Sequence, residues 1–296
     1  MKKIYKFSKG FLPCAIISAV LIVFGIVGLF VKGINLGIDF KPGLIEEFKI
    51  AKDDLNVDAV RDALASIEGI NVKELGTADE RSFQVRTGIS EKTEDRSLQA
   101  EIFNALAAAY GAENVEVIKE EQVGSQFSSS LAKKSIILVL ATMLLIWLYA
   151  TIRFHWDFAL GSIIALVHDM LIMFTFITWT QMEFTTTVLA SVLTIIGYSI
   201  NATVVILDRV RFNMKNKELK SFNDILDKSL SETLSRSIIT TVTTMFASLS
   251  LFFFTTGTIK DFALALTIGL LSGMYSSMFI SSGFISLVRR NWKQAD

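Results

Sequence analysis

The sequence predicts a polytopic α-helical membrane protein with six transmembrane helices and a small α+β, ferredoxin-like extracytoplasmic domain between the first and second helices. Three observations predict this fold class. Hydrophobic residues make up 51% of the 296 positions, and the mean hydropathy is +0.49. The chain has 23 phenylalanines but only 2 prolines, a composition far from that of soluble domains. Six long apolar runs occur, and one acidic segment separates the first run from the other five.

The first apolar run, residues 10–31, contains no charged residue and lies between Lys9 and Lys32. A helix needs about 20 apolar residues to cross a hydrocarbon core of roughly 30 Å. The run is also longer than the core of a signal peptide, so we expect it to be retained as a membrane span. The later runs are 135–152, 158–181, 184–207, 237–259 and 262–288.

Basic residues indicate the orientation, because cytoplasmic loops of membrane proteins are enriched in lysine and arginine. The basic clusters precede span one or follow spans two, four and six: Lys2, Lys3, Lys6, Lys9, Arg153, Arg209, Arg211, Lys215, Lys217, Lys220, Arg289, Arg290 and Lys293. All fall on one side if both termini are cytoplasmic, with Lys133 and Lys134 as the exception. The predicted division is 1–32 for the cytoplasmic N-terminus and span one, 33–134 for the extracytoplasmic domain, 135–288 for spans two to six with a cytoplasmic amphipathic loop at 208–236, and 289–296 for the cytoplasmic C-terminus.

The segment after span one carries the acidic charge. Residues 33–125 contain 19 acidic and 10 basic residues, a net charge of −9. Its patterning predicts strands at 44–50, 70–75, 82–86 and 114–118, and helices at 57–68 and 94–110. This order, β-α-β-β-α-β, is that of a ferredoxin-like domain. We expect either a simple solvated acidic surface or a surface that contacts a partner or an emerging polypeptide.

Several function classes find no support in the residues. The single cysteine, Cys14, excludes an internal disulfide, and the two histidines, His155 and His168, are too few for a multi-histidine metal site. No serine or cysteine stands at a recognisable spacing from a catalytic base, and no basic, aromatic-rich module indicates nucleic-acid binding. We therefore predict no enzymatic activity, no cofactor, no metal and no nucleic-acid partner.

The loop between spans four and five predicts a short amphipathic helix. Residues 221–236 begin with a Ser-x-x-Asp capping pattern, and apolar residues then line one face. We expect this helix to lie on the membrane surface and lead into span five, where it supports the membrane contact or docks a cytoplasmic partner. The loop follows a cytoplasmic anchor at the end of span four, made of Asp208, Arg209 and Arg211.

Asp169 lies near the middle of span three, directly after His168. An aspartate at the centre of a span costs roughly 2.5–3.5 kcal/mol on insertion scales, so it should face the bundle and be either paired or neutral. A carboxyl group that is neutral in a membrane can carry a proton, which makes Asp169 and His168 candidates for an ion relay. The other interpretation is a permanent hydrogen bond between helices.

Spans four to six also present small or polar stripes. In span four, Gly197 and Asn201 follow one helical face, where glycine allows another helix to approach and asparagine can bond across the gap. Arg236 opens span five, where it either snorkels to the interface or has a functional role. Span six contains the close-packing pattern Gly269-x-x-x-Gly273. These stripes predict one packed bundle with a polar seam.

Eight short segments carry a resemblance to a known family: 37–40 (GIDF), 123–124 (VG), 153–154 (RF), 158–161 (FALG), 168–169 (HD), 194–199 (TIIGYS), 208–211 (DRVR) and 234–237 (LSRS). In order and layout they resemble the SecF family of bacterial protein-export subunits, which is related to the resistance-nodulation-division transporters. The resemblance covers nearly the whole chain. It implies a location in the bacterial cytoplasmic (inner) membrane, and as partners SecD, the SecYEG channel, the translocating polypeptide and the lipid membrane. It also implies use of the proton or sodium gradient.

This sequence departs from the family pattern at two places. Where the family usually has Gly-Ile-Asp-Phe-Thr-Gly-Gly, residues 37–43 read GIDFKPG. In span four, the family has a relay carboxylate directly after the asparagine, and this sequence has Ala202. Asn201 and Arg236 match their family positions, but Ala202 cannot carry a proton. The relay therefore falls to Asp169 or to a carboxylate of SecD, or the chain is weakly coupled or uncoupled, or the residue was substituted.

The sequence thus predicts a SecF-type accessory subunit that promotes polypeptide export through a conformational cycle of its outer domain, biased by protonation in the bundle. A proton shifts such a cycle only if the two conformations bind it with different affinity. Two alternatives stay open. One is an ion-uncoupled scaffold that holds SecD and the channel together, which Ala202 favours. The other is a small-molecule exporter of the related superfamily, against which the single small outer domain argues.

Overall fold

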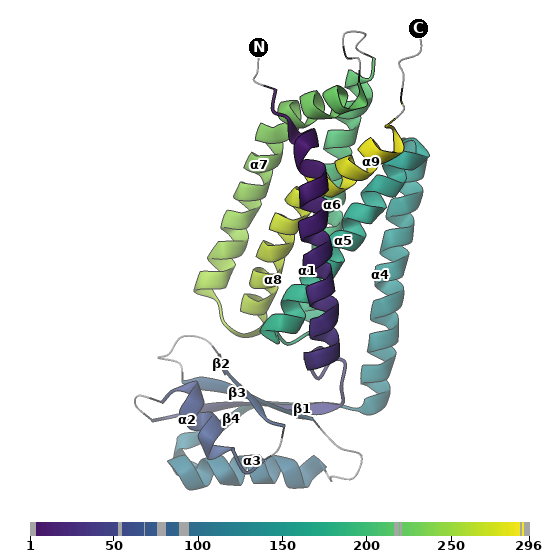
Figure 1. Ribbon diagram of the computed structural model, residues 1–296. Helices are drawn as coiled ribbons and strands as arrows, with labels where there is room; N and C mark the ends of the chain where they lie inside the picture. Colours follow the sequence, from purple (N-terminus) through teal and green to yellow (C-terminus); the bar gives the residue numbers. More distant parts are fainter. Residues whose placement is uncertain are drawn as a thin grey trace.

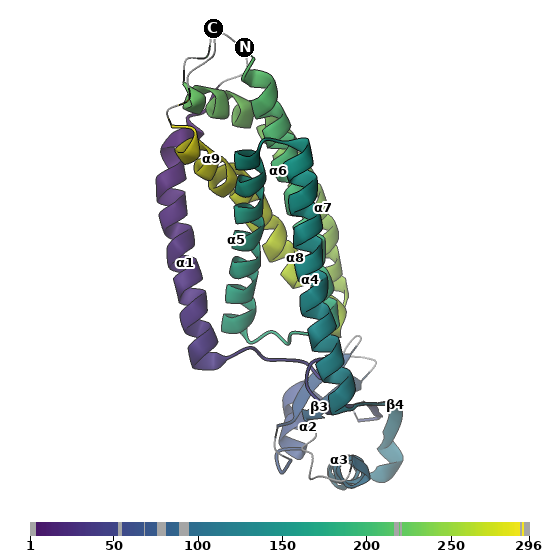
Figure 2. The ribbon, with the colours of Figure 1, turned by 90° about the vertical axis from the view of Figure 1, so that its right-hand side faces the viewer.

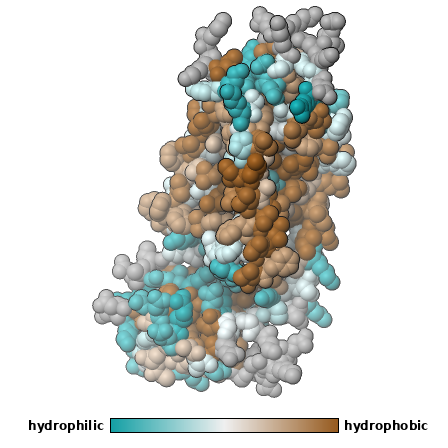
Figure 3. Space-filling view, in the orientation of Figure 1, coloured by the Kyte–Doolittle hydropathy of each residue, from teal (hydrophilic) through white to brown (hydrophobic). Residues whose placement is uncertain are grey.

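The computed structural model describes residues 4–52, 55–67, 69–75, 81–88, 95–215, 219, 221–290 and 292. A bundle of long helices stands on a small sheet domain, and both termini lie at the far end of the bundle (Figure 1). We call the bundle end next to the sheet the sheet end, and the opposite end, near residues 4 and 290, the termini end. A hydrophobic band covers the helices between two more hydrophilic ends (Figure 3), as expected for a protein that crosses a membrane several times.

Among the described residues, six helical segments are long and apolar enough to cross a membrane, which confirms the predicted number. They are α1 (Phe11–Lys32), preceded by the short helix η1 (Phe7–Gly10), α4 (Ser125–Arg153), α5 (Trp156–Thr180), α6 (Thr186–Asn213), α7 (Phe222–Phe254), and the joined run of α8 (Gly257–Tyr275), the π-helix η4 (Ser276–Ser281) and α9 (Ser282–Val288). The second span is longer than predicted, because its helix begins at Ser125 and includes Lys133 and Lys134.

The sheet domain has the predicted β-α-β-β-α-β order. Its elements are β1 (Gly43–Ile50), α2 (Val57–Ala63), β2 (Asn71–Leu75), β3 (Ser82–Gly88), α3 (Asp95–Tyr110), the short turn η3 (Ala112–Asn114) and β4 (Val115–Val123). The strands are antiparallel in the order β2-β3-β1-β4, which is the ferredoxin-like arrangement. Strand β4 runs to Val123 rather than to residue 118, because its extended pairing with β1 continues almost to the start of α4.

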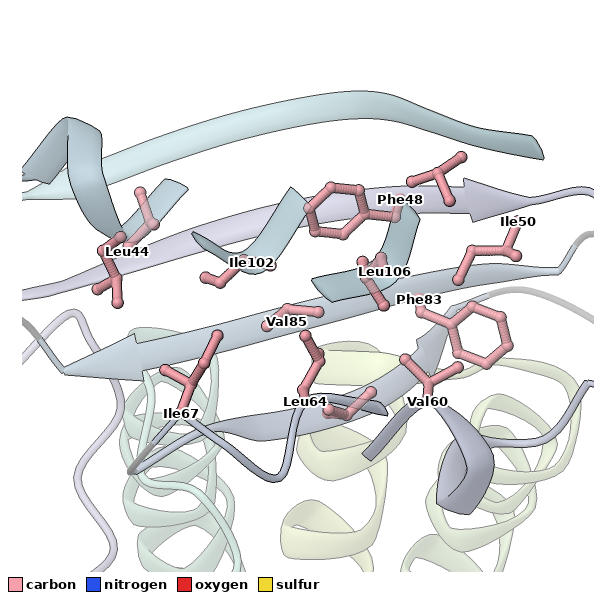
Figure 4. Close-up of a cluster of buried hydrophobic side chains, with 13 residues drawn as sticks. Leu44, Phe48, Ile50, Val60, Leu64, Ile67, Phe83, Val85, Ile102 and Leu106 are labelled. Carbon is pink, nitrogen blue, oxygen red and sulfur yellow. The ribbon is translucent and has the colours of Figure 1, made fainter. Parts of the chain in front are cut away.

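One hydrophobic core holds the sheet domain together. Side chains from the strands, α2 and α3 meet on one side of the sheet (Figure 4), among them Phe48, Phe83, Leu64, Ile102 and Leu106. Each is essentially inaccessible to solvent, and burying a side chain of this size stabilises the fold by about 1.5–3 kcal/mol. Helix α3 lies on the side of the sheet away from the bundle, so the other side faces the sheet end of the helices (Figure 1).

The membrane helices form a buried centre and an exposed periphery. In the most apolar stretch of the α8–α9 run 61% of residues are buried, against 11% in α4 and in α7. Helices α1 and α7 lie along opposite edges of the bundle (Figure 2), and α4 stands at another edge (Figure 1). The faces of α5, α6 and α8 that meet at the centre therefore set the environment of any polar group placed there.

The predicted amphipathic helix at 221–236 forms, but the prediction that its apolar face lies on the membrane surface is wrong. Ser221 caps the helix by accepting a bond from the Asp224 backbone N–H at 3.1 Å, as the capping pattern predicts. The apolar face, which includes Phe222, Ile225 and Leu230, is buried against the termini end of the bundle rather than against lipid. The first turns lie across this end before α7 turns down as the span (Figure 1), and the helix is continuous to Phe254.

Candidate functional site

Asp169 lies in the centre of the bundle and is surrounded by serine hydroxyls from three neighbouring segments. Its side chain is 1% exposed. Oδ2 accepts hydrogen bonds from Ser199 Oγ of α6 at 2.6 Å and from Ser276 Oγ of η4 at 2.8 Å. Oδ1 accepts one from Ser272 Oγ of α8 at 2.7 Å. The aspartate therefore joins α5 to α6 and to the α8–η4 run at a single point.

Glycines bring α8 close enough to α6 for this arrangement. A Cβ added to Gly269 would lie 1.9 Å from Cδ1 of Ile195, and one added to Gly273 would lie 3.2 Å from Cβ of Ser199. A larger residue at Gly269 would thus force Ile195 to repack or the two helices to separate. Gly197 differs, because a Cβ there would meet no atom of the described chain within 4 Å. Its predicted close contact is therefore not made inside this bundle, and Gly197 lies open on the outer face of α6.

The run of α8 changes from α-helix to π-helix next to Asp169 of α5. The π-helix η4 begins at Ser276, the residue that donates to Asp169 Oδ2. Single-turn π segments in helices are rare and often occur at functional sites. The last residue of η4, Ser281, has a buried hydroxyl with no hydrogen-bond partner among the described residues. The segment next to the carboxylate is thus the least regular part of the buried centre.

A chain of polar groups leads from Asp169 to α1. His168 Nδ1 lies 3.2 Å from Asp169 Oδ1, and His168 Nε2 lies 3.0 Å from Ser18 Oγ. Ser18 Oγ lies 3.0 Å from the Tyr275 hydroxyl, which donates to the Cys14 carbonyl at 2.6 Å. His168 and Asp169, which are adjacent in the sequence, are thus linked through the edge of the imidazole ring.

The hydrogens along this chain of polar groups can be assigned from its one obligate acceptor. The Cys14 carbonyl only accepts, so the Tyr275 hydroxyl donates to it and accepts from Ser18. Ser18 has one hydroxyl hydrogen, so it accepts from His168 Nε2, which therefore carries a hydrogen. In a neutral imidazole the other nitrogen, Nδ1, is then bare, and a bond between it and Asp169 Oδ1 needs one more proton. His168 Nδ1 and Asp169 Oδ1 are therefore placed to share a proton.

A separate cluster lies on the outer side of the bundle and consists of Asn201, Ala202 and Arg236. They line a small hollow of about 50 Å³ between α6 and α7, together with Tyr198 and Thr240. Arg236 and Asn201 are exposed, and among the described residues no carboxylate lies within ion-pair distance of Arg236. The structure therefore does not bring Asn201 and Arg236 to Asp169. The methyl group of Ala202 faces the same hollow as the arginine, where a carboxylate at that position would pair with it.

The predicted anchor at the end of α6 forms ion pairs with other helices. Asp208 accepts from Arg153 of α4 at 2.6 Å, and Arg209 donates to Glu232 of α7 at 2.6 Å. Arg211 Nη1 lies 3.5 Å from the Arg153 carbonyl. These bonds tie α6 to its neighbours at the termini end of the bundle.

At the sheet end, a charged network that the sequence did not reveal joins the sheet to the bundle. Arg86 of β3 forms a buried ion pair with Glu183, which lies between α5 and α6. Lys73 Nζ of β2 lies 3.1 Å from Glu183 Oε2 and 2.8 Å from Asp261 Oδ2 of α8. Lys73 therefore connects the α5–α6 loop with α8. The available signal was a lone glutamate between two apolar runs.

Asp39, from the GIDF segment, ties the start of the sheet domain to α6. It accepts bonds from the Thr186 backbone N–H at 2.8 Å and from Thr186 Oγ1 at 2.9 Å. A carboxylate at the first turn of a helix satisfies free N–H groups and favours the helix dipole. Backbone bonds from Gly37 N to Phe184 O (3.0 Å) and from Phe184 N to Asn35 O (2.7 Å) hold the same loop.

The described residues contain no group of three or more His, Cys, Asp or Glu side chains placed to hold a metal ion. The chemistry that the central site offers is instead proton transfer. A carboxyl, an imidazole and several hydroxyls are in hydrogen-bond contact there, and each can donate or accept.

Comparison with known proteins gives consistent matches. The family model of the C-terminal part of the protein export membrane proteins SecD and SecF matches residues 102–291, and the SecD/SecF GG motif matches residues 27–45. The chain is 31% identical to protein translocase subunit SecF of Treponema pallidum, over 98% of both chains. It is 35% identical to that of Borreliella burgdorferi, over 95% of this chain and 96% of the relative.

A solved structure shares the fold. The crystal structure of SecDF from Thermus thermophilus, a translocon-associated membrane protein, matches 98% of this chain with a TM-score of 0.82 and 28% identity. The chain spans 39% of the length of that longer protein.

Proposed function

Because the chain belongs to the SecF family of protein translocase subunits, we propose that it pairs with a SecD protein and uses the proton gradient to promote export of polypeptides across the cytoplasmic membrane. Both termini lie in the cytoplasm and the sheet domain lies outside, where it contacts the emerging polypeptide. The assembly acts beside the SecYEG channel. The observation that carries the proposal is the buried Asp169 carboxyl, which contacts His168 and three serine hydroxyls in the centre of the bundle.

The proton biases the packing of the α8–η4 run. With the proton bound, the pair is neutral and one carboxyl oxygen is engaged with the imidazole. When the proton leaves, a negative charge remains in the middle of the membrane, and only serine hydroxyls of the described residues stabilise it. Hydrogen bonds to a charged acceptor are stronger than those to a neutral one, so Ser199, Ser272 and Ser276 hold their helices to α5 more firmly when the charge appears. The two protonation states thus favour different positions of α8 and η4.

The charged network at the sheet end, which we call the joint, transmits this movement to the outer domain. It consists of Lys73, Arg86, Glu183 and Asp261. Lys73 contacts Glu183 on the α5–α6 loop and Asp261 on α8. A displacement of α8 relative to α5 and α6 therefore acts directly on β2. Asp39 ties the other end of the domain to the start of α6, so the domain is held at two points that move relative to each other.

The exposed face of α6 and α7 supports the pairing with SecD. The exposed polar residues on this side are Asn201, Arg236, Thr240 and Thr243. Polar groups that face lipid in a membrane are costly, and they usually face another helix instead. Helices of SecD cover this face in the proposed complex, and a SecD carboxylate supplies the counter-charge that Ala202 does not.

The test is reconstituted export under an imposed proton gradient. The chain is incorporated with its SecD partner and the channel, and the export of a secretory polypeptide is followed with and without the gradient. We expect Asp169→Asn to reduce export to the level seen without a gradient, because an amide cannot release a proton. The matched control is Asp58→Asn, which removes an exposed carboxylate of the sheet domain and should leave export unchanged.

One observation favours a second function, an ion-uncoupled scaffold for SecD and the channel. The hollow beside Arg236 holds Ala202 where the family has a carboxylate. If Asp169→Asn leaves gradient-dependent export intact, the proton carrier is not Asp169. If gradient dependence arises only in Ala202→Asp, the scaffold describes this chain.

A further inference from the structure

A cationic hollow lies at the termini end of the bundle, away from Asp169 and from the outer domain. Its volume is about 570 Å³. The ends of four helical segments surround it, and its lining residues are Ile152, Arg153, Phe154, His155, Phe158, Arg211, Met214 and Arg289. None of these residues takes part in the proton pair or in the joint with the sheet.

The charges around the hollow do not balance. Arg289 forms a two-pronged ion pair with Asp157, and Arg153 pairs with Asp208 at 2.6 Å. Arg211 donates to the carbonyl of Arg153 at 3.5 Å, and no carboxylate of the described residues lies within ion-pair distance of it. Three arginines thus meet two carboxylates, which leaves a net positive charge inside the hollow.

The position of the hollow suits a lipid headgroup. Trp156, directly beside it, is 56% exposed, as is typical of aromatic residues at the membrane boundary. Ile152 forms its lip and is 79% exposed, and the exposed side chains of Leu148 and Leu145 continue from there along α4 into the apolar band. A molecule with an anionic head and an apolar tail would place the head among the arginines and the tail along α4.

We propose that this hollow binds the phosphate of an anionic phospholipid, with Arg211 as the arginine that is free to hold it. The planar guanidinium donates two parallel hydrogen bonds to phosphate oxygens. The first turn of α5, which lines the hollow at His155 and Phe158, adds the positive end of a helix dipole. Basic pockets between helix ends are a general mode of anionic lipid recognition. A soluble phosphate compound shares this chemistry and is separated from a lipid by the experiment.

Native mass spectrometry of the full chain in a non-ionic detergent tests the proposal. The probes are dioctanoyl phosphatidylglycerol, dioctanoyl phosphatidylcholine and inorganic phosphate. We expect phosphatidylglycerol to bind in preference to the other two, and Arg211→Ala to weaken its binding about fivefold. Arg290→Ala removes the same charge at the same end but outside the hollow, and should leave binding unchanged. Arg211→Lys, which keeps the charge but not the planar fork, should lie between Arg211→Ala and the unmodified chain.

Three results would overturn the proposal. Equal weakening in Arg211→Ala and Arg290→Ala would indicate a general attraction between lipid and a basic surface. Inorganic phosphate that binds as tightly as phosphatidylglycerol would assign the hollow to a soluble phosphate compound. If Arg211→Ala does not fold, Ile152→Glu replaces it, because it puts a negative charge on the exposed lip without disturbing a buried contact. Undiminished phosphatidylglycerol binding in Ile152→Glu would exclude the hollow as the site.

Discussion

Two buried carboxylates at different heights of the bundle show how this chain uses charge. Asp169, in the middle of α5, is 1% exposed, and three serine hydroxyls and His168 contact it. Glu183, at the sheet end, is 5% exposed and faces Arg86 and Lys73. Both are removed from water, but of the two only Glu183 has permanently charged partners among the described residues.

This difference in partners suits Asp169 to a change of protonation and Glu183 to a permanent ion pair. A carboxylate that faces two cations keeps its charge, because neutralising it would leave the cations buried without a partner. A carboxylate among hydroxyls tolerates either protonation state, because a hydroxyl donates or accepts as required. We therefore expect changes at the joint to alter stability and changes at Asp169 to alter proton binding.

The largest expected effect comes from breaking the joint with Arg86→Met. This change leaves Glu183 buried without its closest cation, which should destabilise the docked sheet domain by about 3–5 kcal/mol. Thermal and denaturant unfolding of the full chain in detergent measures the loss. The control is Arg61→Met, whose ion pair with Asp58 is exposed and should be worth about 0–1 kcal/mol. Similar losses in the two variants would show that the joint is not a buried ion pair.

A third buried carboxylate, Glu46, sharpens the comparison because its neighbour has the same charge. It lies on the core side of β1, is 2% exposed, and faces Glu120 across the strand pair. Burial, and then the charge of Glu120, raise the pKa of Glu46 from 4.5 to about 7. Between these values the folded state binds more protons than the unfolded state, so stability falls as pH rises through this window, by up to about 3 kcal/mol.

Hydrogen exchange of the β1 and β4 amides, corrected for intrinsic rates, measures this dependence at pH values on either side of the window. Protection should be greater at the acidic side, and Glu46→Gln should remove the difference. Glu116→Gln, an exposed residue of β4, is the control. A pH dependence that persists in Glu46→Gln would assign it to another group.

The sequence predicted the elements better than their contacts. The six spans and the β-α-β-β-α-β order follow from local periodicity and were confirmed. The ion pair of Arg86 with Glu183 joins residues 97 positions apart, and the bond of Asp39 to Thr186 joins residues 147 apart. Such contacts depend on how the sheet docks and how each helix is rotated, which local patterns do not contain.

The site shows the same limit. Asp169 stood out because a carboxyl in an apolar run is unusual whatever its neighbours are. Ser199, Ser272 and Ser276 did not stand out as its donors, because serines are common on packed helix faces and only the rotation of α6 and α8 aims them at one point. The segment 221–236 is an amphipathic helix as predicted, yet the same pattern of apolar residues fits burial against lipid and against protein equally well.

Gly269→Ala tests whether the serine shell depends on close helix packing. The added Cβ would lie 1.9 Å from Ile195 Cδ1, so Ile195 must repack or α8 must move away from α6, at a cost of about 1–3 kcal/mol. Gly197→Ala is the matched control, because open space surrounds Gly197 and alanine favours the helix by up to about 1 kcal/mol. Unfolding in detergent should rank the two variants on opposite sides of the unmodified chain. Equal stability of the two variants would mean that the Ile195 side chain moves aside without strain and that the helices do not need a glycine at position 269.

The smallest expected effect on stability is that of Asp169→Asn, although this carboxyl is the more deeply buried of the two compared. An asparagine resembles the protonated aspartate: its oxygen accepts from serine hydroxyls, and its amide donates to His168 Nδ1. Because this exchange keeps the hydrogen bonds and leaves no charge without a partner, the free energy of unfolding should change by less than about 1 kcal/mol. Asp157→Asn is the control, since Asp157 is equally buried but faces Arg289, and it should lose several times more. A large loss in Asp169→Asn would show that Asp169 is permanently ionised and would remove the basis for a shared proton.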